Sequence, residues 1–138
     1  MSVLPLSRWP WLRRWFGDRS ERAAVRFLRR LGYRIHSRNF RCPAGELDII
    51  ALDRRCLVFV EVRSTGQSDP ERPMLSIDAE KQRRMSAAAV RFLQSRQLVD
   101  VPSRFDVLIV CWPAGQREPR IDHFPNAFEA VGKFQMGY

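Results

Sequence analysis

Two strand-like runs joined by a short polar link constrain the fold of this chain more than any other feature. The runs are GELDIIALD, residues 45–53, and CLVFVEVR, residues 56–63. Only residues 54–55 separate them, which is the length of a two-residue hairpin loop. The pattern therefore predicts an antiparallel hairpin in which Asp53 pairs with Cys56.

This register places two acids, Asp48 and Glu61, directly across from each other. Side chains alternate along a strand, so eight of them are expected on one face: Glu46, Asp48, Ile50, Leu52, Leu57, Phe59, Glu61 and Arg63. Opposed carboxylates destabilise a sheet. At roughly 5 Å and an effective dielectric constant of ~20, their repulsion is about 3 kcal/mol.

A cation between the two acids would offset that cost, and hard divalent cations prefer carboxylate oxygens. The hairpin therefore predicts a metal site at Asp48 and Glu61. The alternative is that both are solvated carboxylates paired with nearby arginines. Glu46 is expected to pair across the hairpin with Arg63 rather than to bind a metal.

The rest of the chain predicts helices before and after this hairpin. A helix over residues 18–31 has a capping-box pattern at Asp18 and Glu21 and a stop at Gly32. A strand over 33–40, a polar loop over 64–73, a helix over 77–95 and strands over 105–112 and 121–124 complete the pattern. The expected fold is α/β in the order α-β-β-β-α-β, with a mixed sheet flanked by helices.

The length of the chain limits the number of domains, and its net charge indicates the kind of partner. The 138 residues suit one domain, over residues 17–125, with a Trp- and Arg-rich extension (1–16) and a C-terminal tail (126–138). A net charge of +9 indicates a polyanionic partner, with nucleic acid first and an anionic membrane surface second. Basicity that serves only solubility is the alternative.

Cysteine usage and hydropathy bear on the compartment. Three cysteines without C-x-x-C spacing argue against a disulfide framework and a zinc site, and fit a reducing cytoplasm. No run has the length of a membrane span, so stable membrane insertion is not expected. Asp106 is expected to be a structural partner for an arginine, whereas His36 and His123 are isolated in the sequence.

Glu21, Asp48 and the triplet Glu61-Val62-Arg63 together resemble the core of PD-(D/E)XK nucleases, which have a restriction-endonuclease-like fold. The chain is more closely similar to the YraN-like family of small bacterial proteins, which are related to archaeal Holliday-junction resolvases. The resemblance covers residues 17–110. Its stretches are SERAAVRFL, GELDIIALD, LVFVEVR and IDAEKQRRM.

The resemblance implies a structure-selective DNA endonuclease that depends on Mg²⁺ or Mn²⁺. Asp48 and Glu61 would hold the metal together with the backbone carbonyl of Val62. Glu21 would approach the same metal from the first helix, directly or through water.

The main departure from the family pattern is Arg63, which stands where related nucleases have a catalytic lysine. An arginine stabilises phosphoryl charge but is a poor base. The chain contains only two lysines, and Lys81 on the second helix could substitute.

The implied partner is branched or single-stranded DNA, and a homodimer would suit symmetric cleavage of a branched substrate. Four arginines are candidates for phosphate contacts: Arg38, Arg41, Arg83 and Arg84. Two other functions stay open. One is a non-catalytic nucleic-acid-binding protein that keeps the nuclease fold, and the other is attachment to a membrane surface through the N-terminal extension.

Overall fold

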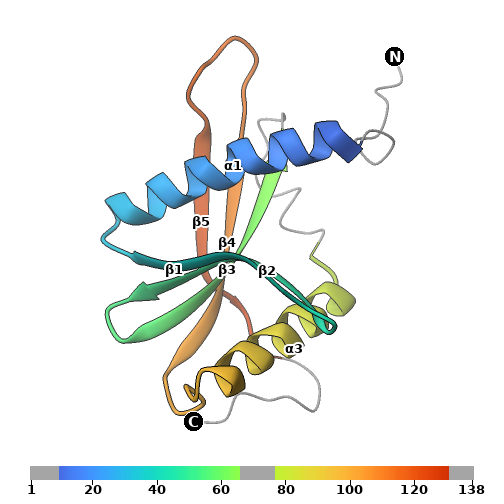
Figure 1. Ribbon diagram of the computed structural model, residues 1–138. Helices are drawn as coiled ribbons and strands as arrows, with labels where there is room; N and C mark the ends of the chain where they lie inside the picture. The colour runs from blue at the N-terminus through green and yellow to red at the C-terminus, as the bar shows by residue number, and fades with distance from the viewer. Residues whose placement is uncertain (1–9, 66–76, 131–138) are drawn as a thin grey trace.

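A computed structural model describes residues 10–65 and 77–130 and shows one mixed sheet with helices on both faces (Figure 1). The strand order is β1-β2-β3-β4-β5, with β3 and β4 parallel and the other neighbours antiparallel. The predicted α/β class and element order are confirmed, with a longer last strand. The elements are α1 (Pro10–Arg30), β1 (Arg34–Cys42), β2 (Gly45–Asp53), β3 (Cys56–Thr65), α3 (Ala79–Ser95), β4 (Ser103–Cys111) and β5 (Arg120–Phe128).

Helix α1 begins eight residues earlier than the sequence pattern predicts. Pro10 is its first residue, a position that proline tolerates because no backbone N–H is needed there. Asp18 therefore lies inside the helix, and the predicted capping box with Glu21 is wrong. The predicted stop is confirmed: Gly32 adopts a φ of 95°, and its N–H donates to the Arg29 carbonyl.

The β2–β3 hairpin has the predicted register at its turn. Asp53 pairs with Cys56, and the ladder continues to Ile49 and Val60. Arg54, at the first turn position, has the left-handed φ of 58° that a two-residue loop requires. The paired ladder ends before Asp48, so the two acids lie where the strands cease to pair.

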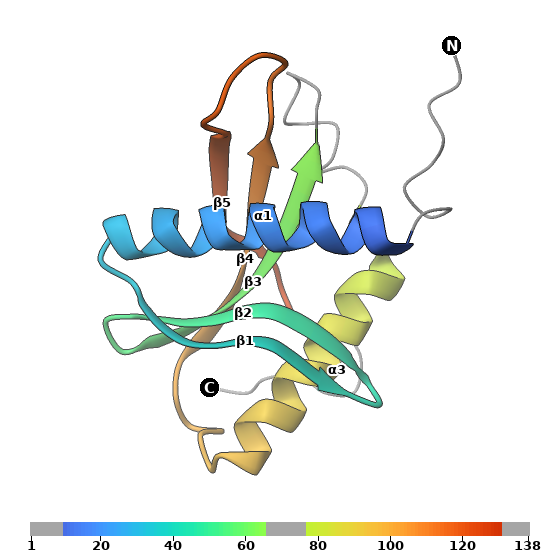
Figure 2. The same cartoon turned by 45° about the horizontal axis from the view of Figure 1, so that its top comes forward.

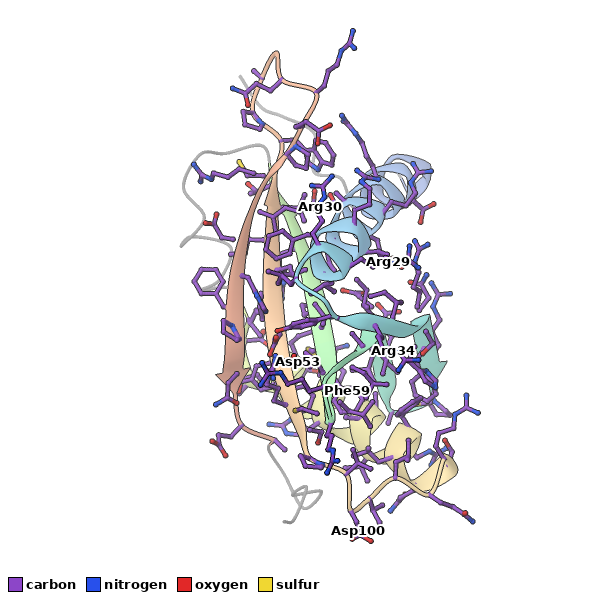
Figure 3. All side chains as sticks on the ribbon, turned by 90° about the vertical axis from the view of Figure 1, so that its left-hand side faces the viewer. Arg29, Arg30, Arg34, Asp53, Phe59 and Asp100 are labelled. Atoms are coloured by element: carbon purple, nitrogen blue, oxygen red, sulfur yellow. The ribbon has the colours of Figure 1, made fainter. Side chains whose placement is uncertain are left out.

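The two faces of the hairpin pack against different helices (Figures 1 and 2). Ile50 and Phe59 belong to the core cluster that contains Phe92 of α3. Ile49 and Val60 belong to the cluster that contains Leu28 of α1. Seen from the side, Phe59 lies in the interior of the molecule (Figure 3). The acids at the end of the hairpin are therefore reached by side chains from both helices.

Side-chain alternation along β2 is interrupted at Asp48. Leu47 packs in the α3 cluster although Ile49, two residues later, packs in the α1 cluster. On the neighbouring strand, Asn39 has a φ of 56° between Arg38 and Phe40, which pair with Ile49 and Leu47. The predicted alternation is therefore wrong on β2 beyond Ile50, whereas β3 keeps it, with Phe59 on the α3 side and Val60 and Val62 on the α1 side. Asp48 lies at the switch between the two faces.

The β1–β2 turn closes directly onto α3, as Figure 2 shows. A Cβ atom at Gly45 would lie 2.7 Å from the carbonyl oxygen of Arg84, which is closer than real Cβ contacts come. Because the clash would be with helix backbone, only glycine permits this approach. The contact sets the distance between β2 and α3, and with it the width of the cleft described below.

Gly45→Ala is expected to lower the free energy of unfolding by about 1–3 kcal/mol and to shift α3, because the helix backbone must move away. Denaturant unfolding and amide NMR shifts of α3 measure the two effects. Gly115→Ala is the control, since its φ of 77° makes alanine unfavourable while no atom lies within 4 Å of the added carbon. Unchanged α3 resonances in Gly45→Ala would contradict the proposed spacing role.

Candidate functional site

A cleft of ≈ 440 Å³ opens where β2 and β3 cease to pair and α3 begins. Its lining is almost entirely polar and combines acids with basic side chains. The residues are Glu46, Asp48, Glu61, Val62, Arg63, Asp78, Lys81 and Arg84. The predicted acid pair and both candidate catalytic cations therefore lie in one cleft, although they come from β2, β3 and α3.

Asp48 and Glu61 form a hydrogen-bonded carboxyl pair. The Val62 N–H donates to Asp48 Oδ2 at 2.9 Å, so a side chain occupies a ladder position at the end of the hairpin. Burial and then the negative charge of Glu61 raise the pKa of Asp48 to about 8. Full ionisation of both acids is therefore disfavoured as long as no cation lies between them.

Two cations contact the same oxygen of Glu61, which is 5% exposed. Lys81 Nζ lies 3.3 Å from Glu61 Oε2, and Arg63 Nε lies 3.4 Å from it. Asp78 caps α3 and accepts a hydrogen bond from the Lys81 N–H at 2.8 Å, which places Lys81 in the first turn of the helix. The cap on α3 therefore directs the lysine toward β3.

Glu21 is buried beside this pair but is held by β1. Its Oε1 accepts hydrogen bonds from Arg38 Nε at 2.8 Å and from Asn39 Nδ2 at 3.1 Å. Burial raises the pKa of Glu21 although Arg38 acts against it, and the charge of Asp48 adds to the rise. Within the described residues no three His, Cys, Asp or Glu side chains are placed to hold a metal ion. The approach of Glu21 to the metal, directly or through water, stays a prediction.

A polar contact that the sequence did not reveal ties α1 to the sheet beside Glu21. Ser20 is 1% exposed, donates to Ser64 Oγ at 2.7 Å and accepts from Trp112 Nε1 at 2.8 Å. These bonds join α1 to the ends of β3 and β4. They position the helix turn that carries Glu21.

The donor set of the acid pair fits a hard divalent cation. Asp48 and Glu61 offer carboxylate oxygens, which Mg²⁺ and Mn²⁺ prefer. Burial and the charge of Glu61 both raise the pKa of Asp48, so a cation between the two acids would lower the cost of bringing them together.

The four arginines predicted to contact phosphate have different surroundings. Arg84 lines the cleft, and Arg83 is exposed on α3 outside its lining. Arg38 is engaged by Glu21, and Arg41 pairs with Glu46 at 3.5 Å. The predicted pair of Glu46 with Arg63 is therefore wrong, because the β1–β2 ladder places Arg41 directly across from Glu46.

A second polar cluster surrounds Asp106, which is fully buried on β4. Arg104 Nε, His123 Nε2 and the Asn126 N–H lie 3.0, 2.8 and 2.9 Å from its oxygens. Burial opposes ionisation, but these hydrogen bonds keep the pKa of Asp106 below its ordinary value. An arginine partner for Asp106 is confirmed. His123 is isolated in the sequence, but it is not isolated in the structure, because the pairing of β5 with β4 brings it to Asp106.

The Arg104 guanidinium also donates to the Tyr33 hydroxyl at 2.6 Å and to Asp53 at 3.2 Å. The cluster thus joins the turn end of the β2–β3 hairpin to β4 and to the start of β1. These residues do not line the cleft, so we assign the cluster to the stability of the sheet.

Within residues 10–65 and 77–130, no helix combines the length and apolar character needed to cross a membrane. Residues 1–9 of the Trp- and Arg-rich extension lie outside the described residues. Surface attachment through that segment stays a prediction.

Comparison with known proteins gives a consistent family match. The model of the uncharacterised protein family UPF0102 matches residues 20–110. A UPF0102 protein of Geobacter metallireducens is 44% identical over 115 residues, which cover 82% of this chain and 91% of that protein. A UPF0102 protein of Rhodopirellula baltica is 40% identical over 119 residues, covering 84% of this chain and 71% of the relative. The matched region contains every element that lines the cleft.

Asp48→Asn is expected to change how stability depends on pH. Between the ordinary aspartate pKa of 3.8 and about 8, the folded protein keeps a proton that the unfolded chain has released. Raising the pH through this window therefore lowers the free energy of unfolding of the wild type, by up to about 1.4 kcal/mol per pH unit. The amide in Asp48→Asn does not titrate, so the variant gains stability relative to the wild type as pH rises.

Urea unfolding at several pH values between 5 and 8 measures this difference. A difference in the free energy of unfolding that is the same at every pH would report only the altered hydrogen bond with Val62. Parallel stability profiles would therefore contradict the raised pKa of Asp48.

Proposed function

The chain belongs to the uncharacterised protein family UPF0102, and from this premise we propose that it is a metal-dependent nucleic-acid phosphodiesterase. The proposed substrate is branched or single-stranded DNA, which makes it a structure-selective endonuclease of the Holliday-junction-resolvase type. The observation that carries the proposal is the acid pair of Asp48 and Glu61, flanked by Lys81 and Arg63 in an open cleft.

In this proposal Asp48 and Glu61 hold Mg²⁺ or Mn²⁺. A divalent ion supplies polarisation of the phosphoryl oxygen and a lower pKa for a bound water. Release of the proton from Asp48 must accompany metal binding, because the ionised carboxylate is the ligand. Val62 supports Asp48 through its N–H and offers its carbonyl as a further oxygen donor.

The two cations divide the work that a single lysine performs in the resembling nucleases. Lys81 orients the attacking water, since its ammonium lies in the cleft at 3.3 Å from Glu61 Oε2. Arg63 stays charged and stabilises the negative charge that develops on the phosphoryl oxygens. Glu21 acts through Arg38 and Asn39 as a positioning residue at the edge of the site.

A non-catalytic nucleic-acid-binding protein is the second candidate, and one observation favours it. Lys81 and Arg63 both pair with Glu61, so the acids are compensated by the protein's own cations. Such a protein would bind DNA with a steep salt dependence but yield no product with either metal. An Arg63→Lys variant that stays inactive at every pH would favour this candidate.

Asp48→Ala and Glu61→Ala are each expected to reduce cleavage of flap and four-way-junction DNA at least about a hundredfold, because each removes a metal ligand. Quantified product at matched Mg²⁺ concentrations measures the loss. Gel-shift binding in EDTA controls for folding and DNA affinity. Products that persist unchanged in both variants would assign the activity to a contaminant.

Lys81→Met is expected to slow cleavage about a hundredfold or more, because the cation that lies beside Glu61 and orients the attacking water is lost. Arg91→Met, an exposed arginine on the same helix outside the cleft, is the matched control. Equal rates of cleavage in Lys81→Met and Arg91→Met would exclude a specific role for Lys81 in the cleft.

A further inference from the structure

A second hollow adjoins the cleft and has a different character. Its volume is ≈ 280 Å³, close to the lower limit of about 300 Å³ for small-molecule pockets. It shares Glu46, Lys81 and Arg84 with the cleft, so the two spaces are continuous along one wall. The remaining lining consists of Arg41, Cys42, Gly45 and Met85.

Polar and apolar groups are separated within this hollow. Cys42 and Met85 belong to the core cluster that contains Phe92 of α3, and they form the apolar part of the lining of the hollow. A polarisable thioether makes favourable contacts with flat aromatic rings. Gly45 adds only backbone to the lining and lies against the backbone of Arg84. The apolar part of this lining accepts a planar ring, beside the basic side chains of Arg41, Lys81 and Arg84.

Glu46, the one acid in the described lining of this hollow, independently indicates that a base binds there. Glu46 stands among Arg41, Arg84 and Lys81, where a groove that held only phosphates would gain nothing from a carboxylate. Its side chain is 54% exposed and its pair with Arg41 is long, at 3.5 Å, so the pair opens at little cost. Each DNA base carries an N–H donor that a carboxylate can accept, whereas a phosphodiester carries none.

We infer that this hollow binds one unpaired base of the DNA strand, next to the phosphate placed at Asp48 and Glu61. The inference rests on the proposed function and adds what the substrate must supply, namely a base free to leave the stack. Arg41 and Arg84 would contact the flanking phosphates or stack on the ring, and Glu46 would accept from the base edge. A base in a continuous duplex cannot enter, so the hollow selects single-stranded arms and branch points.

Cys42 provides a direct test because its thiol lines the hollow and is partly exposed. Flap DNA is prepared with an activated aryl disulfide tethered to a base at successive positions of the single-stranded arm. Attack by Cys42 Sγ forms a protein–DNA disulfide and releases the aryl thiolate. Cross-linking is measured in EDTA, so that binding is tested without cleavage.

The yield is expected to peak at one position near the branch, about tenfold above positions three or more nucleotides away. Cys42→Ala or Cys42→Ser should abolish the peak, and Cys56→Ser, altered at a half-buried cysteine outside the hollow, should keep it. An even yield along the arm, no cross-link on bound DNA, or a peak that survives loss of Cys42 would each overturn the inference.

A second measurement separates base from phosphate at the peak position. An abasic nucleotide there is expected to weaken binding about tenfold, as loss of a stacked base does. Weakening by a neutral methylphosphonate but not by the abasic nucleotide would show that a phosphate occupies the hollow, and the inference would fail. A position-specific cross-link without any cleavage would support the base site while refuting the nuclease proposal. Cleavage without such a cross-link would support the nuclease proposal and refute the base site.

Discussion

The structure of the site depends on the point at which β2 and β3 stop pairing. Up to Ile49 and Val60 the hairpin is a regular ladder with a different helix on each face. At Asp48 the alternation switches, and the Val62 N–H turns to a carboxylate. Two acids that a continuous sheet would hold in simple repulsion become a pair in a cleft, where burial and the charge of Glu61 raise the pKa of Asp48. This interruption creates both the space and the ligand set for a cation.

The two helices bring opposite kinds of group to that point. Helix α3 brings Lys81 to Glu61, and the contact of Gly45 with the Arg84 carbonyl sets how closely the helix approaches. Helix α1 brings Glu21, held by Arg38. Uncompensated charge gathers elsewhere, as on Arg29, Arg30 and Arg34, which are exposed at the junction of α1 and β1 (Figure 3). These arginines do not line the cleft, so the acid pair and this basic surface are separate features of the molecule.

Local patterns were sufficient where the determinants are close in sequence. The hairpin register followed from the spacing of Asp53 and Cys56, and the acid pair followed from that register. Prediction failed where distant segments decide the outcome. A capping pattern at Asp18 led to the wrong start for α1, which begins at Pro10. The partner of His123 depended on the pairing of β5 with β4. The partner of Glu46 depended on β1, which places Arg41 across from it.

By itself the sequence determined the mixed α/β fold, the hairpin and the candidate acids Asp48 and Glu61, because alternation and turn length are local properties of the chain. Only the tertiary structure decided that Lys81 and Arg63 meet at one oxygen of Glu61, and that a base-sized hollow lies beside the cleft. Those features arise from the packing of α3 against the β1–β2 turn. No local pattern encodes that distance, since it results from backbone contact between residues far apart in the chain.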